Sequence, residues 1–189
     1  MGAPYALAAA SLLPERVTAV GVISGLAGWL AGPGALTDVR PEFRTFASWC
    51  RHLRPAARAF TAFQARGFRR DPEGTVRKEA ATTGGDDPGI IDDERVRAML
   101  VASAHEVWDR GGEGTYEHSI AVTQPWGFSL ADVHQHVEVW HGTANHEILP
   151  AMAEHAARTL PDARLRLVDG RGHLLAFADW GEVIASIVG

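Results

Sequence analysis

Hydrophobic residues follow one spacing at the two ends of the chain and another in its middle. Residues 4–13 are rich in Ala and Leu at helical spacing, Pro14 follows them, and residues 17–23 form a short apolar run. This order predicts a helix, a tight turn and a buried strand. Alternation of strands and helices returns near the C-terminus, where the expected elements cover residues 137–140, 150–160, 164–168 and about 178–187. The pattern predicts an α/β protein with a mostly parallel sheet.

The middle of the chain shows helical segments and no strong strand signal. Prolines and a loop over residues 82–88 separate the segments. Asp92 or Asp93 can cap a helix that carries its apolar residues on one face, and Gly111 and Gly112 mark the end of that helix. We therefore divide the chain into residues 1–29, a helical part over 30–126, and residues 127–189.

Composition and charge argue against a nucleic-acid partner, a membrane span and a disulfide. The 189 residues are 46% hydrophobic and 22% charged with a net charge of -5, which is typical of a soluble globular protein. No stripe of Lys and Arg indicates a nucleic-acid partner. Residues 17–37 carry no charge, but glycines and Pro33 interrupt them, so we expect no membrane span. Cys50 is the only cysteine, which excludes an intrachain disulfide and suits a reducing cytoplasm.

Several histidines raise the question of a metal site. His134 and His136 alternate along an extended segment, and His141 and His146 follow closely. The chain has no His-Glu-x-x-His motif and no pair of cysteines. We interpret these histidines as polar residues of loops and strand ends, and we expect neither a metal nor a cofactor.

Three groups of residues resemble segments of bacterial α/β hydrolases, in the same order. The first comprises GAPYALA at 2–8, LPERV at 13–17 and VISG at 22–25, and it is similar to the segment after the nucleophile elbow. The second, PWGF at 125–128 and VWHGTAN at 139–145, resembles the approach strand and the acid loop. The third, GRGH at 170–173, resembles the histidine loop. The resemblance implies an α/β-hydrolase fold that is N-terminally truncated and carries a helical cap insertion over 30–126.

His173 is the strongest candidate for chemistry. Gly170 and Gly172 flank a tight turn after a strand and present His173 at the C-terminal edge of the sheet, where α/β proteins place their ligands. A histidine there can act as a general base near neutral pH. The alternative is a loop histidine satisfied by backbone contacts. The resemblance implies the catalytic role.

The sequence departs from the family pattern at two positions. Asn145 stands where the resemblance implies an aspartate, and an amide cannot stabilise an imidazolium as a carboxylate does. Glu147 or Asp169 could substitute for that acid. The implied nucleophilic serine would lie just before Met1, with Gly2 as the last glycine of the elbow.

Other nucleophiles do not replace that serine. Ser24 ends a strand without an elbow, Ser11 lies within a predicted helix, and Cys50 lies in the cap.

Two functions stay open. The first is a serine hydrolase of the esterase type, which holds a small apolar ester or acyl substrate between sheet and cap and uses His173 as the base. The second is an inactive protein of the same fold, or an incomplete gene product, that binds a small ligand. The substrate-binding residues that we expect are Met1, Gly2, Trp29, Trp126 and His141, and Trp140 is a further candidate wall.

One edge of the sheet raises the possibility of self-association. The resemblance implies that the strand from Val17 to Ile23 is an interior strand, whose neighbour would come from upstream. A bare apolar edge pairs readily with another chain. We therefore expect one of two outcomes: either the natural product is longer and Met1 is an internal codon taken as the start, or the chain pairs with itself or with a partner through the edge of this strand.

Overall fold

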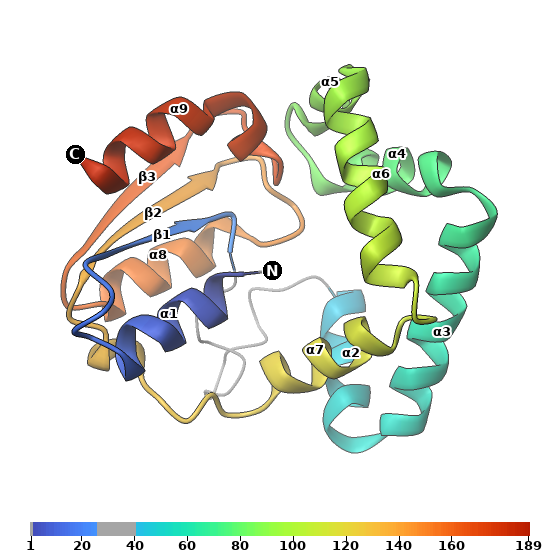
Figure 1. Cartoon of the computed structure of the whole chain (residues 1–189), viewed down its shortest axis with the longest axis horizontal. Coiled ribbons are helices and arrows are strands. Elements are labelled where there is room, and N and C mark those ends of the chain that lie inside the picture. The colour runs from blue at the N-terminus through green and yellow to red at the C-terminus, as the bar shows by residue number, and fades with distance from the viewer. Residues whose placement is uncertain (1, 26–40) are drawn as a thin grey trace.

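A parallel sheet of three strands organises the protein (Figure 1). The computed structural model describes residues 2–25 and 41–189. The strands are β1 (Ala19–Ile23), β2 (His136–Gly142) and β3 (Ala163–Val168), in the order β1-β2-β3. Val139 of β2 pairs with Val22 on one side and Leu165 on the other. The parallel sheet confirms the predicted α/β class, although β1 begins at Ala19 and is shorter than predicted.

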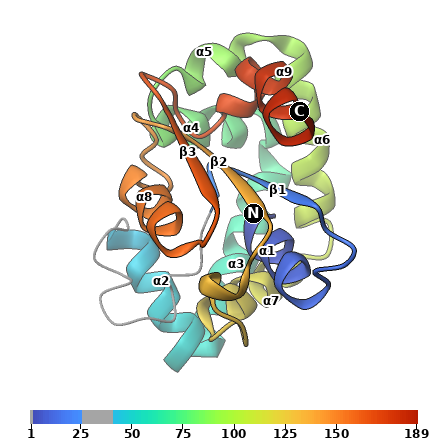
Figure 2. The same cartoon turned by 90° about the vertical axis from the view of Figure 1, so that its left-hand side faces the viewer.

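Three helices cover the two faces of this sheet (Figures 1 and 2). α1 (Ala3–Leu12) and α8 (Pro150–Thr159) pack on one face, and α9 (Leu175–Val188) packs on the other. Val137 and Val139 of β2 are buried among α1 and α8. Trp140 points to the opposite face and is buried with residues of α9. Helices cover both faces of the central strand, and Glu138, on the same face as Trp140, is buried there in a hydrogen bond of 2.9 Å with Arg166.

Six helices form the cap, and Figure 1 shows them grouped beside the sheet and its covering helices. They are α2 (Pro41–His52), α3 (Arg54–Arg70), α4 (Pro72–Thr83), α5 (Asp87–Asp92), α6 (Glu94–Trp108) and α7 (Glu113–Thr123). No strand occurs in the cap between residues 41 and 123, as the sequence predicts. A short 3₁₀ helix, η2 (Leu130–Asp132), connects α7 to β2.

The predicted capped helix of the middle region is α6. The Asp93 side chain accepts a hydrogen bond from the backbone nitrogen of Arg95 at 2.8 Å, as an N-cap does. Gly111 and Gly112 follow with φ of 69° and 86°. The apolar residues of α6 are less buried than their spacing suggests, since Met99 is 51% exposed. Leu100 and Trp108 of the same helix pack against a small core cluster around Phe68, and they also line a cavity.

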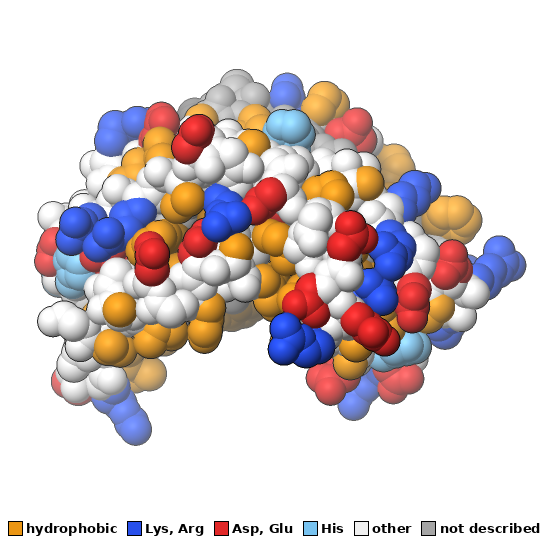
Figure 3. All heavy atoms as spheres, turned by 90° about the horizontal axis from the view of Figure 1, so that it is seen from above, with side chains coloured by type: hydrophobic (Ala, Val, Ile, Leu, Met, Phe, Trp, Pro, Cys, Tyr) orange, Lys and Arg blue, Asp and Glu red, His pale blue; other side chains and the backbone are white. Residues whose placement is uncertain are grey.

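Among the described residues, neither outer edge of the sheet has a paired strand, and α9 exposes an apolar stripe. No described strand pairs with the outer edge of β1. An apolar stripe on α9 is exposed to solvent and consists of Phe177, Trp180, Ile184 and Val188. Figure 3 looks down on the side that carries α9 and shows hydrophobic side chains on the sheet half and in the hollow between the two halves. No described helix combines the length and the apolar character needed to cross a membrane.

Candidate functional site

The histidine loop joins β3 to α9 and forms the turn that the sequence predicts. Gly170 has φ of 70°, a left-handed conformation that glycine adopts without strain. Arg171 donates its backbone N–H to the carbonyl of Val168 at 3.4 Å and closes the turn. His173 follows directly, at the C-terminal end of the sheet and facing the cap.

The cap touches this loop through backbone atoms. A Cβ atom at Gly172 would collide with the carbonyl oxygen of Gly84 and with the carboxyl group of Asp87. A Cβ atom at Gly85 would collide in turn with the backbone nitrogen of Gly172. Glycine on both sides therefore allows the loop before α5 to lie directly against the histidine loop.

Asp87 holds the histidine loop from the cap side. Its side chain is fully buried, and its carboxylate accepts hydrogen bonds from the backbone nitrogens of His173 and Leu174, both at 2.8 Å. These donors lie at the N-terminus of α9, where backbone N–H groups lack helical partners and the helix dipole favours negative charge. This contact explains why α9 begins at Leu175, earlier than its sequence predicts.

Arg171 ties the same loop to two further carboxylates. Its guanidinium makes two hydrogen bonds of 2.9 Å to Asp179 of α9 and a third bond to Asp86. Asp86 also accepts the backbone N–H of Gly172 at 3.2 Å. The hydrogen bonds with Asp179 and Asp86 raise the pKa of Arg171. The network joins the cap, the histidine loop and α9 through charge-assisted hydrogen bonds.

Asn145 and His173 lie side by side, as the resemblance implies. Asn145 Nδ2 is 3.3 Å from His173 Nδ1. The Asn145 Oδ1 atom accepts the backbone N–H groups of Glu147 and Ile148, at 3.0 and 3.1 Å. Because these two donors require the oxygen, the amide nitrogen faces the ring and donates to Nδ1. A neutral His173 then carries its proton on Nε2, which makes that nitrogen a donor and not a base.

The surroundings of His173 favour its neutral form. Burial lowers the pKa of His173, and the nearby carboxylates of Glu147 and Asp87 partly counteract this shift. Asp169 accepts a hydrogen bond from the hydroxyl of Thr143 at 3.2 Å. Asn145 is the described side chain that hydrogen-bonds to the ring; Asp169 is bonded to Thr143 instead, and Glu147 acts on His173 through its charge.

His141 holds the acid loop through a hydrogen bond to its backbone. The side chain is fully buried at the end of β2, and its Nε2 atom donates to the carbonyl oxygen of Ile148 at 2.8 Å. Burial lowers the pKa of His141. Its Nδ1 atom is buried and has no described partner. These contacts place His141 behind the loop and not in the lining of the cavity.

A cavity of about 300 Å³ lies between the cap and the histidine loop. That volume is at the small end of the range for ligand pockets. Most of its wall is apolar and comes from α4, α5 and α6, while His173 and Glu79 contribute the titratable groups. The lining residues are Val76, Glu79, Ala80, Thr83, Ile91, Leu100, Ser103, Ala104, Val107, Trp108, His173 and Leu174.

The other expected binding residues lie elsewhere. Trp126 donates its indole N–H to the carbonyl of Val122 at 3.2 Å and packs beside Phe128, and the described cavity does not include it. Trp140 is part of the core against α9. The cavity is instead lined by Trp108 of α6, which is not among the tryptophans predicted from the sequence.

The N-terminal part of the expected site is described only in part. Gly2 is exposed and caps α1 through its carbonyl oxygen, which accepts the backbone N–H groups of Tyr5 and Ala6 at 3.1 Å. Met1 and Trp29 lie outside the described residues.

No described nucleophile is hydrogen-bonded to His173. Ser24 has φ of 47° and a buried hydroxyl without a described partner, and it does not line the cavity. Cys50 is fully buried in α2, where burial raises the pKa of its thiol. Thr83 lines the cavity, but its hydroxyl donates to the carbonyl of Ala80 at 3.0 Å.

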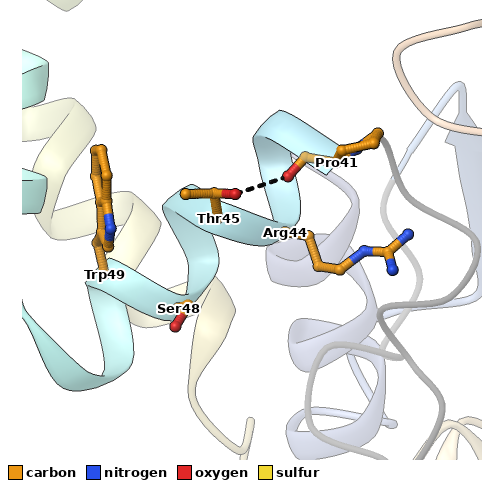
Figure 4. Close-up of a pocket in the computed structure, with 5 residues that line it drawn as sticks. All are labelled: Pro41, Arg44, Thr45, Ser48 and Trp49. Carbon is orange, nitrogen blue, oxygen red and sulfur yellow. Dashed lines mark hydrogen bonds between the residues drawn. The ribbon is translucent and has the colours of Figure 1, made fainter.

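A second hollow of about 500 Å³ lies along α2, away from His173 (Figure 4). Its described lining residues are Pro41, Arg44, Thr45, Ser48 and Trp49. All five belong to one helix, and the only hydrogen bond drawn among them joins the Thr45 hydroxyl to the Pro41 carbonyl at 3.0 Å. Among the described residues, no group of three His, Cys, Asp or Glu side chains is arranged to hold a metal ion.

Comparison with known proteins gives a clear structural result. No protein-family model matches the sequence, and no curated protein matches it. Solved structures do match. An α/β-hydrolase-fold protein from Nakamurella multipartita has a TM-score of 0.59 and 15% identity, with 95% of this chain and 62% of that protein covered.

Two further solved structures are similar to this chain over almost its whole length. A thermophilic esterase from Thermogutta terrifontis has a TM-score of 0.61 and 17% identity, with 98% of this chain and 59% of the esterase covered. A 2-hydroxy-6-oxo-6-phenylhexa-2,4-dienoate hydrolase from Rhodococcus sp. strain RHA1 has a TM-score of 0.63 and 16% identity, with coverage of 98% and 59%. The chain thus spans about three fifths of the length of these structures. Identities at this level establish the fold, and the protein therefore has the α/β-hydrolase fold with a helical cap.

Proposed function

We propose that this protein binds a small, largely apolar molecule in the cavity beside His173 and that, as it stands, it does not hydrolyse that molecule. The cavity carries the proposal, because it combines an apolar wall from the cap with the half-buried, polar ring of His173 at the C-terminal end of the sheet. This is the arrangement of a ligand site in an α/β protein.

The hydrogen bond between Asn145 and His173 supports the absence of turnover. A general base needs a free lone pair on the nitrogen that faces the nucleophile, and the Asn145 amide favours a proton there. Rotating the amide would turn its oxygen to the ring, but its nitrogen would then face the N–H groups of Glu147 and Ile148. Two buried donors would lose their acceptor, so this rotation is unfavourable.

A cavity-filling substitution tests the proposed binding. We expect 2-phenylethanol, a neutral apolar probe, to bind the wild-type protein in calorimetry. Ala104 lines the cavity, so Ala104→Trp should weaken binding at least about tenfold by occupying the space. Ala102 lies on the same helix, is exposed and does not line the cavity, so Ala102→Trp is the matched control. Equal affinities for all three proteins would refute binding at this place.

Ester hydrolysis is the second candidate, for a form of the protein that supplies a serine. The observations that favour it are the retained His173 at the expected loop position and the esterase and hydrolases among the similar structures. In such a form the serine oxygen would attack the acyl carbon while His173 Nε2 takes the serine proton. His173 would then return that proton to the departing alkoxide.

Four versions of the protein separate the two candidates on one activated ester, 4-nitrophenyl acetate. The wild-type chain and Asn145→Asp should both be inactive. A version extended upstream by a segment ending in Gly-x-Ser should show weak turnover. Adding Asn145→Asp to it should raise the rate by up to about 10⁴-fold, the size of the loss when a triad aspartate becomes asparagine. Turnover by the unextended chain that disappears in His173→Ala would overturn the proposed inactivity.

A further inference from the structure

The cavity beside His173 carries a negative charge on its otherwise apolar lining. Glu79 of α4 lies on its lining, with part of its surface open to solvent and part against the protein. No Lys or Arg belongs to the described lining, and His173 is held neutral by burial. Glu79 forms no ion pair with a described residue. It is therefore a carboxylate at the rim of an apolar cavity without a compensating cation.

A second carboxylate adds to this negative potential from the acid loop. Glu147 lies close enough to act on both groups: its charge raises the pKa of Glu79, after the larger effect of burial, and it also raises the pKa of His173. The charge of Glu147 therefore adds to the negative potential at Glu79, while burial keeps His173 itself neutral. Low-dielectric walls strengthen such a field inside a cleft.

The other carboxylates near the cavity do not offer such a potential. Asp87 uses both oxygens on the backbone N–H groups of His173 and Leu174. Asp86 is paired with Arg171. Glu79 is thus the lining carboxylate that is open to a ligand.

We propose that the cavity selects molecules that join a small apolar body to an ammonium group, with the body against α4 and α6 and the ammonium at Glu79. The inference rests on the proposed function, because it assumes that the cavity beside His173 takes a ligand. An amine bound in this way makes a charge-assisted hydrogen bond to Glu79, and a carboxylate in the same place is repelled by the charge of Glu79.

Three probes of the same shape test this selectivity: 2-phenylethylamine, which is an ammonium ion at pH 7.5, 2-phenylethanol and phenylacetate. We expect the amine to bind about tenfold more tightly than the alcohol, and phenylacetate to bind least. Calorimetry in low salt measures all three. The preference for the amine should shrink as sodium chloride is added, because the interaction lies at an exposed rim.

Glu79→Gln should abolish the preference for the amine and leave the affinity for the alcohol unchanged. Glu73 lies on the same helix, has a side chain that is 69% exposed, and does not line the cavity, so Glu73→Gln is the matched control and should behave as wild type. Equal binding of amine and alcohol to the wild type, or a preference that survives Glu79→Gln, would overturn this inference while leaving ligand binding intact. Failure of all three probes to bind would overturn the proposed function as well.

Discussion

The side chain of Asn145 donates to Nδ1 of His173 over 3.3 Å while its oxygen accepts two backbone N–H groups. This single contact determines which ring nitrogen carries the proton. It also leaves the half-buried ring without a negatively charged partner at Nδ1. Both properties can be reversed by one substitution.

Asn145→Asp should raise the pKa of His173 by about one unit or more and move the proton of the neutral ring to Nδ1. A carboxylate accepts from Nδ1–H and stabilises the imidazolium, which an amide cannot do. Nitrogen chemical shifts in an NMR titration report both changes. Asp169→Asn is the control, since Asp169 is bonded to Thr143 and its removal should leave His173 unchanged. An unshifted His173 in Asn145→Asp would show that the two side chains do not meet in solution.

Asp87→Ala should lower the free energy of unfolding by about 2–4 kcal/mol, because it leaves the N–H groups of His173 and Leu174 without their buried acceptor. Asp87→Asn should cost less, since its oxygen can still accept one of the two bonds. Urea denaturation gives the values. Asp92→Asn, at a side chain that is 75% exposed, should change stability by less than about 0.5 kcal/mol. A loss in Asp87→Ala no larger than that of the control would show that the hydrogen bonds of Asp87 to His173 and Leu174 do not stabilise the fold.

His136 should make stability depend on pH in a direction opposite to the buried histidines. Hydrogen bonds to Asp162 and Glu138 raise the pKa of His136 above 6.5, so its charged form is favoured in the folded state. The stability it contributes is full below pH 6.5 and disappears as the pH rises through the folded pKa. Burial lowers the pKa of His141 and His173, and their contribution is lost as the pH falls below 6.5.

The comparison of His136→Gln with wild type isolates the first effect. The variant should be less stable by up to about 1 kcal/mol at pH 5.5, because the side chain of His136 is 40% exposed and its ion pairs are screened. The difference should shrink at pH 8.5. A difference that grows with pH would show that the assigned direction is wrong. Chemical denaturation at the two pH values provides the measurement.

The outer edge of β1 should promote self-association of the chain on its own. No described strand covers that edge, and unpaired strand edges pair with other chains. We expect oligomers or insoluble protein, detected by light scattering. Thr18→Lys, at an exposed position just before β1, should reduce the oligomer, and Thr82→Lys on α4 should not. A monodisperse wild-type monomer that unfolds cooperatively would contradict this expectation.

Much of the sheet and its helices could be predicted because their residues carry strong periodic signals. Residues 137–140 and 164–168 were predicted as strands from their apolar runs, and both lie within β2 and β3. The helix over 150–160 is α8. The proximity of Asn145 and His173 followed from the resemblance and from the way parallel strands bring their C-terminal loops to one edge.

The cap side of the site could not be predicted in this way. Asp87 and Glu79 carry no local signal that separates them from solvated acids, because their roles depend on where the cap lies relative to the histidine loop. The place of Trp108 in the cavity lining could not be predicted either, because α6 buries its apolar residues only partly. One sign was present in the sequence: the glycine pair Gly84 and Gly85 directly before two aspartates.

The contact between Gly85 and Gly172 positions the cap without using the side chains that line the cavity. Main-chain atoms meet main-chain atoms there, and the side chains that face the cavity come from α4, α5 and α6, outside this contact. Substitutions on those helices can therefore change the size and polarity of the cavity while His173 keeps its place. The backbone contact fixes the cap against the histidine loop, whereas the side chains that line the cavity are free to vary. New ligand preferences can therefore arise in this protein through cap substitutions that leave the histidine loop unchanged.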